Sequence, residues 1–169
     1  VFQGCAIVEK LIYPLWKAET TDSDAFRDQL LASLRQLAAQ PGIRGLRFAV
    51  ADSEVAHGHH RRMAATRPLP DAMLSVWLDA AAGQRERVEA GLREPVSRHH
   101  CYLVTEAEPL VNRSYPPGAD GRIPGMCHVV FLQRPPRLSE SEWLSIWQQS
   151  HTQVAIDTQS TFAYRQNVI

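Results

Sequence analysis

The sequence predicts an α+β fold, in which strands alternate with amphipathic helices. Over residues 24–40, apolar side chains recur every three or four positions, as on one face of a helix. Over residues 46–50, Leu46, Phe48 and Val50 alternate with polar or small residues, as in a half-buried strand. The chain has 169 residues and 44% hydrophobic residues, which is enough to bury a core.

The first two thirds of the chain contain elements in the order β-α-β-β-α-β. A strand over residues 6–16 precedes a helix that begins at the capping cluster Thr21–Asp24 and runs to Gln40. Its apolar face is Phe26, Leu30, Leu34 and Leu37. Strands are expected near 46–50 and 73–78, and the polar segment over 52–70 between them is expected to be a loop. A helix over 83–94 follows, with Val88 and Leu92 facing inward, and it leads to a strand over 100–106. This order is that of a ferredoxin-like unit.

The last third restarts the pattern as strand, helix, strand. Phe26 is aligned with Trp143 at an offset of 117 residues, and the same offset aligns Leu34 with His151. We therefore expect a tandem repeat with a degenerate first copy over residues 5–111, a linker over 112–125 and an incomplete second copy over 126–169. An incomplete sheet leaves an exposed edge. We expect that the natural chain is longer, with a disordered segment or one supplied by another chain as the alternatives.

The helix of this last third carries the most informative motif. Ser139 and Glu142 have the spacing of a capping box. Trp143, Trp147 and His151 follow at intervals of four, which predicts that all three share one helical face.

The helix motif Trp147–His151 and the following strand Tyr164–Val168 resemble the EthD-like family. The resemblance implies ferredoxin-like repeats that form a dimeric α+β barrel, with a ligand cavity between the sheet and its helices. It also implies an accessory role in a degradation pathway, or polyketide-type decarboxylation, isomerisation or dehydration.

The candidate site centres on His151, a possible general acid or base near neutral pH. Alternation along the strand directs Tyr164 and Gln166 to one face and Asn167 to the other. In an enzyme, His151 would move a proton while Tyr164 or Asn167 orients an enol or carbonyl oxygen.

The two tryptophans, Trp143 and Trp147, would form the walls of this site for an aromatic ring. The alternative is a non-catalytic binding or accessory protein for a hydrophobic metabolite, in which His151 fixes orientation or packs. The tryptophans could also be ordinary core residues, with His151 bonded to a backbone carbonyl. Some folds of this type ligate haem through histidine, but no second feature of the sequence favours haem.

Composition excludes several classes of partner. The net charge is zero and the apolar runs are of strand length, so neither nucleic acid nor membrane is expected as a partner. A homodimer is expected, because ferredoxin-like units tend to pair through their exposed sheet edges. We expect no cofactor, because phosphate-binding glycine loops are absent. The cluster His57, His59 and His60 is not expected to bind a metal, because Arg61 and Arg62 would oppose a cation.

The number and spacing of the cysteines indicate the cellular compartment of the protein. Cys5, Cys101 and Cys127 are odd in number and lack the CxxC spacing. They are expected to be reduced thiols on strands, and hence to indicate a cytoplasmic protein.

Overall fold

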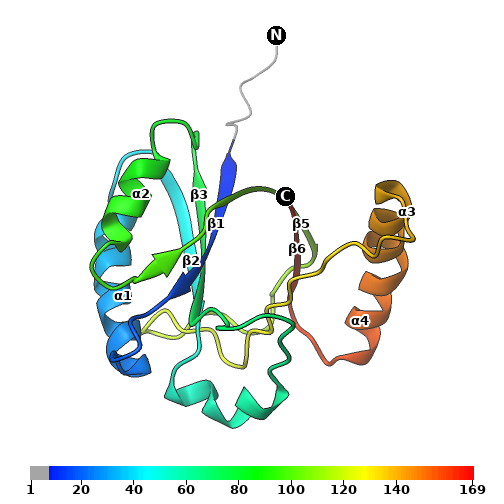
Figure 1. Cartoon of the computed structure of the whole chain (residues 1–169), viewed down its shortest axis with the longest axis horizontal. Coiled ribbons are helices and arrows are strands. Elements are labelled where there is room, and N and C mark those ends of the chain that lie inside the picture. The colour runs from blue at the N-terminus through cyan, green and yellow to red at the C-terminus, as the bar shows by residue number, and fades with distance from the viewer. Residues whose placement is uncertain (1–7) are drawn as a thin grey trace. The chain divides into compact units, whose positions relative to one another are not determined.

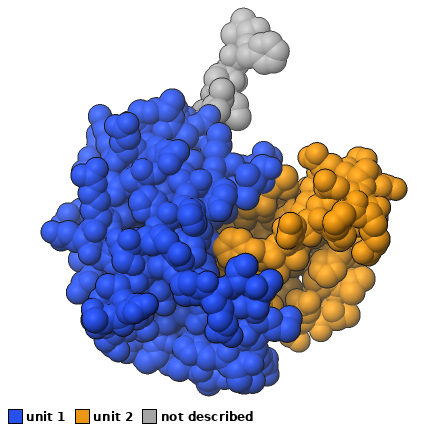
Figure 2. All heavy atoms as spheres, viewed as in Figure 1, with its two compact units in different colours: residues 1–105, 169 blue, residues 106–168 orange. Residues whose placement is uncertain are grey.

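The computed structural model describes residues 8–169. The chain forms two compact units, shown in different colours in Figure 2. The first extends to Thr105 and includes Ile169, and the second is Glu106–Val168. The boundary between the units lies within a strand, a few residues before the predicted linker over 112–125.

The first unit contains the predicted β-α-β-β-α-β order. Its elements are β1 (Glu9–Trp16), α1 (Ser23–Ala38), β2 (Ile43–Val50), β3 (Ala72–Leu78), α2 (Arg85–Leu92), β4 (Arg98–His99) and β5 (Tyr102–Leu110), the last of which continues into the second unit. The sheet is antiparallel in the order β2-β3-β1-β5, and β4 also pairs with β1. The ferredoxin-like α+β fold is therefore confirmed. The predicted first strand is confirmed from Glu9 onward, and residues 6 and 7 lie outside the described residues.

Helices α1 and α2 cover one face of this sheet (Figure 1), and the core of the unit lies between them and the strands. The predicted inward face of α1 is confirmed, since Phe26, Leu30, Leu34 and Leu37 are buried. Val88 and Leu92 of α2 are buried as predicted. Asp22 caps α1 by accepting the backbone N–H groups of Asp24 and Ala25. Each large apolar side chain in such a core contributes about 1.5–3 kcal/mol.

The prediction that the polar segment over 52–70 is a loop is wrong for part of the segment. Residues Ser53–Arg61 form a 3₁₀ helix, η1. Its start is attached to α1: the guanidinium of Arg27 lies 3.2 Å from the carboxylate of Asp52, which is buried, and the N–H of Ser53 donates to Asp24 at 3.0 Å. These long-range contacts supply the order that local composition did not indicate.

The second unit consists of the end of β5, a long helical segment and one further strand. The helical segment is continuous through α3 (Glu140–Ser145), η2 (Ile146–His151) and α4 (Thr152–Thr158), and β6 (Tyr164–Val168) pairs with β5. The predicted helix and final strand are thus confirmed.

The strand predicted to begin at Met126 is wrong. Residues 111–139 contain no helix or strand, and the large apolar side chains there are 42–60% exposed; they are Met126, Val129, Val130, Phe131 and Leu132. The pattern of this run suits a strand, but a strand also needs a neighbour for its backbone N–H and C=O groups. Within residues 8–169 the run has no such neighbour.

The expectation that the cysteines lie on strands is wrong for the two that are described. Cys101 falls between β4 and β5, and Cys127 is exposed in the irregular segment. Both are free thiols, and Cys5 lies outside the described residues. Among residues 8–169, no helix combines the length and the apolar character that crossing a membrane requires.

Candidate functional site

The helical segment of the second unit begins at the predicted capping box. The hydroxyl of Ser139 accepts the N–H of Glu142 at 3.3 Å, and the carboxylate of Glu142 accepts the N–H of Ser139 at 2.9 Å. The pKa of Glu142 is lowered, mainly because its carboxylate accepts a hydrogen bond from the Ser139 side chain and, to a smaller extent, because it accepts one from the Ser139 backbone. The start of the helix is therefore specified locally, by residues that are three positions apart.

The middle of the segment departs from α-helical geometry. Residues Ile146–His151 form a π-helix, in which backbone bonds run from i+5 to i, and the N–H of Thr152 donates to the carbonyl of Trp147. The residue that follows Trp147 on the inward face is consequently Thr152, which is 4% exposed, whereas His151 is exposed. The prediction that His151 shares one face with both tryptophans is wrong, because it assumed a regular α-helical period.

The two tryptophans of the motif lie against each other. The ring centroids of Trp143 and Trp147 are 5.3 Å apart and their planes are inclined by 31°. The indole Nε1–H of Trp147 is buried and has no hydrogen-bond partner. A buried N–H without an acceptor costs about 1–3 kcal/mol, and this is the one buried side-chain polar atom of residues 140–158 without a partner.

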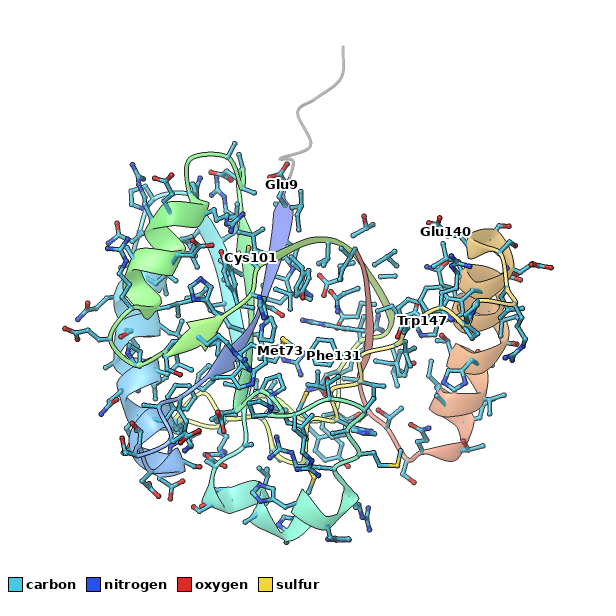
Figure 3. All side chains as sticks on the ribbon, viewed as in Figure 1. Glu9, Met73, Cys101, Phe131, Glu140 and Trp147 are labelled. Atoms are coloured by element: carbon cyan, nitrogen blue, oxygen red, sulfur yellow. The ribbon has the colours of Figure 1, made fainter. Side chains whose placement is uncertain are left out.

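Strand β6 contributes a buried polar contact beside the tryptophans. Gln166, which is 3% exposed, donates through Nε2 to the hydroxyl of Thr152 at 2.5 Å. The same hydroxyl donates to the carbonyl of Trp147 at 2.6 Å. Gln166, Thr152 and Trp147 thus form one chain of contacts that joins the helix to the strand, and Figure 3 shows Trp147 on the side of the helix that faces β6.

The remaining predicted site residues are less closely connected. Tyr164 and Asn167 are both half-buried on β6. Between Tyr164 and Gln166, Arg165 donates to Glu108 of β5 at 2.8 Å, which attaches β6 to the sheet. The side chain of His151 forms no hydrogen bond or ion pair with the part of the chain that the structure describes. The structure therefore brings together Trp143, Trp147 and Gln166, but not His151.

An open cleft of about 400 Å³ lies on a different face of the helix from the tryptophans. It is lined by Leu138, Ser141, Glu142, Ser145 and Ile146. None of the predicted site residues lines it. Across residues 8–169, no three His, Cys, Asp or Glu side chains are grouped so that they could hold a metal ion.

Sequence reasoning missed Thr152 as a member of the site. Its hydroxyl is the contact between Trp147 and Gln166, yet it is offset by one position from the expected i, i+4 series. A threonine beside an exposed histidine carries no local signal for a π turn. The tertiary contact with the buried amide of Gln166 is what distinguishes it.

Comparison with known proteins gives no activity for this chain. No protein-family model matches the sequence, and no curated protein matches it significantly. Among solved structures, the chain is similar to a dimeric ferredoxin-like protein of unknown function from Thermobifida fusca, with 16% sequence identity and a TM-score of 0.39. The alignment covers 61% of this chain and 94% of that chain.

Proposed function

We propose that this chain is an EthD-like protein that binds a small aromatic or polyketide-like compound on the inward face of its C-terminal helix. The observation that carries the proposal is the buried indole N–H of Trp147, which has no acceptor. A carbonyl or enol oxygen of a ligand would satisfy it. The neighbouring ring of Trp143 offers a flat surface on which an aromatic ring can stack.

The polar contacts around Trp147 support a binding role more directly than a catalytic one. Gln166 and Thr152 are buried and hydrogen-bonded to each other, so they hold the helix at a fixed distance from β6. Because these side chains are already ordered, a ligand that binds against them does not lose binding free energy to ordering them. We therefore favour a non-catalytic binding or accessory protein for a hydrophobic metabolite.

The test is a titration of the protein with a panel of small aromatic ketones, each paired with its analogue that lacks the carbonyl oxygen. Trp147→Phe keeps an apolar ring and removes the N–H. It should therefore lower the affinity for the ketones by roughly three- to tenfold, which corresponds to the loss of one hydrogen bond. The carbonyl-free analogues should be nearly unaffected. Isothermal titration calorimetry measures both.

Trp143→Phe is the matched control, because it makes the same change on the neighbouring turn. Its effect should be similar for ketones and their analogues. If the wild-type protein binds no member of the panel saturably, or if Trp147→Phe weakens ketones and analogues equally, the proposed role of the indole N–H is wrong.

A second function, a cofactor-independent isomerase, decarboxylase or dehydratase, is favoured by one specific observation. The π-helix ends at His151, and π turns within α-helices occur frequently at functional sites. In this mechanism His151 would act as general acid or base, and Tyr164 or Asn167 would orient the oxygen of an enol intermediate.

Product analysis of any ligand found above separates the two functions. An enzyme would convert it, and His151→Ala would bind it with unchanged affinity but without turnover. Equal binding by wild type and His151→Ala, with no product from either, would leave the binding role alone.

We also propose that the chain contains two EthD-like repeats and forms a homodimer. The pairing of β6 with β5 supports the repeats, because the last strand of the first copy then contacts a strand of the second. The exposed apolar run Met126–Leu132 supports the dimer, since a further strand from a second copy would cover it.

A further inference from the structure

The first unit contains a cleft that the proposed function does not use. It has a volume of about 560 Å³ and lies where the chain leaves η1 and approaches β3. Its lining residues are His59, Arg62, Arg67, Pro68, Leu69 and Asp71. Pockets for small molecules in proteins have volumes of about 300–1,000 Å³, so the cleft is large enough for one.

The cationic side chains of the cleft have few partners of their own. Arg62 donates one N–H of its guanidinium to the carbonyl of Pro70 at 3.1 Å, which leaves its other donors available. Arg67 makes no hydrogen bond or ion pair with any residue that the structure describes, and neither does the side chain of His59. Two arginines and a histidine thus line one cleft, and no carboxylate of the described residues is bonded to their side chains.

The single carboxylate of the cleft is already engaged. Asp71 accepts the backbone N–H of Lys17 through Oδ2 at 3.1 Å, which fixes the chain at the start of β3. One carboxylate against two arginines leaves the lining positive. This excess favours an anion over a metal ion, as the sequence also indicated for the neighbouring histidines.

The apolar wall of the cleft is held in place from β1. Trp16 donates through Nε1 to the carbonyl of Pro68 at 3.0 Å, and the guanidinium of Arg98 lies 4.0 Å from the centroid of the Trp16 ring. Pro68 and Leu69 are the apolar residues of the lining. The cleft is therefore amphipathic, with a cationic side and an apolar side.

We propose that this cleft binds a small molecule that has an apolar body and an oxyanion, either a carboxylate or a phosphate. Arginine suits both anions, because its planar fork of N–H donors matches a pair of oxygen atoms. Arg62 and Arg67 bind the oxyanion, and Pro68 and Leu69 contact the body. The site is independent of the tryptophan face on the C-terminal helix.

The experiment is calorimetric titration of the whole chain with benzoate and with phenyl phosphate, at constant ionic strength in chloride. The double variant Arg62→Gln/Arg67→Gln removes both guanidinium groups. The matched control is Arg35→Gln/Arg93→Gln, which makes the same change in charge elsewhere on the first unit. We expect saturable binding by the wild type, a loss of at least about tenfold in the first variant and an unchanged affinity in the control. Binding of benzoate alone, of phenyl phosphate alone or of both identifies which oxyanion the site accepts.

Asp71→Asn distinguishes an anion site from a cation site. An asparagine oxygen can still accept the N–H of Lys17, so the fold is retained, and the loss of negative charge should tighten oxyanion binding. The proposal is overturned if neither probe binds saturably, if both double variants lose affinity equally, or if Asp71→Asn weakens binding while the protein remains folded by circular dichroism.

Discussion

Threonine 152 shows how one side chain can join two elements of the second unit. Its hydroxyl donates to the carbonyl of Trp147 and accepts the amide of Gln166, and both Thr152 and Gln166 are almost fully buried. Buried polar groups are stable only while they remain paired. The hydroxyl therefore stabilises the helix against β6, as well as the π turn beside it.

Replacement of this hydroxyl by a methyl group should be costly. Thr152→Val keeps the side-chain shape but leaves the amide of Gln166 buried without its acceptor, so we expect a loss of about 1–3 kcal/mol in the free energy of unfolding. Urea denaturation followed by circular dichroism measures it.

Thr158→Val is the matched control for this prediction. Thr158 donates only to a carbonyl of its own helix and is exposed, so its replacement should change stability by less than about 0.5 kcal/mol. Equal effects of the two substitutions would show that the contact with Gln166 contributes nothing.

At the scale of the element, local sequence determines where the C-terminal helix begins, but it does not determine the geometry of the middle of that helix. The capping box forms because Ser139 and Glu142 have the required types and spacing. The π turn four residues later breaks the regular period, and with it the expected alignment of His151 with Trp147.

The capping box supplies a prediction at this scale. Ser139→Ala removes an N-cap hydroxyl and should destabilise the second unit by about 1 kcal/mol at neutral pH. Ser150→Ala is the control, because Ser150 bonds only to a carbonyl of the preceding turn and its replacement should have little effect. Thermal unfolding and hydrogen exchange of the amides at the start of α3 provide the measurement.

The effect of Ser139→Ala should depend on pH in a defined direction. The pKa of Glu142 is lowered in the folded protein from its usual value of 4.5, so the ionised carboxylate contributes stability above that pH. This contribution is lost as the pH falls through the lowered pKa. The difference between wild type and Ser139→Ala should therefore shrink under acid conditions, and a constant difference would contradict the role of Glu142.

At the scale of the whole molecule, one stretch of the described chain leaves its large apolar side chains uncovered. Five large apolar side chains within seven residues are exposed between Met126 and Leu132, and the sequence carries no net charge to keep copies apart. Such a run is typical of a segment that is covered in the assembled protein.

We expect the protein to form a dimer through this run. Phe131→Lys places a charge in it and should shift the mass measured by size-exclusion chromatography with light scattering toward that of the monomer. Met63→Lys is the control, since Met63 is 93% exposed in the first unit and its replacement should leave the mass unchanged. A monomeric wild type, or a dimer that both variants retain, would overturn this prediction.

In the first unit, the sequence by itself determined the order of the strands and α-helices and the buried face of each α-helix. The buried faces of α1 and α2 were predicted residue by residue, because helical period and capping chemistry are local properties. The alternation of Leu46, Phe48 and Val50 likewise placed β2, although the bounds of each element shifted by a few residues.

Only the tertiary structure decided the rest. The run from Met126 has the composition of a strand, but it has no neighbour to pair with among the described residues. The 3₁₀ helix η1 depends on the contact between Asp52 and Arg27. The inward position that follows Trp147 is occupied by Thr152. The cleft of Arg62 and Arg67 also depends on a wall that Trp16 holds from another strand. Each of these features depends on contacts between residues distant in the sequence or on a departure from regular helical period, and periodicity and capping within one segment do not specify either.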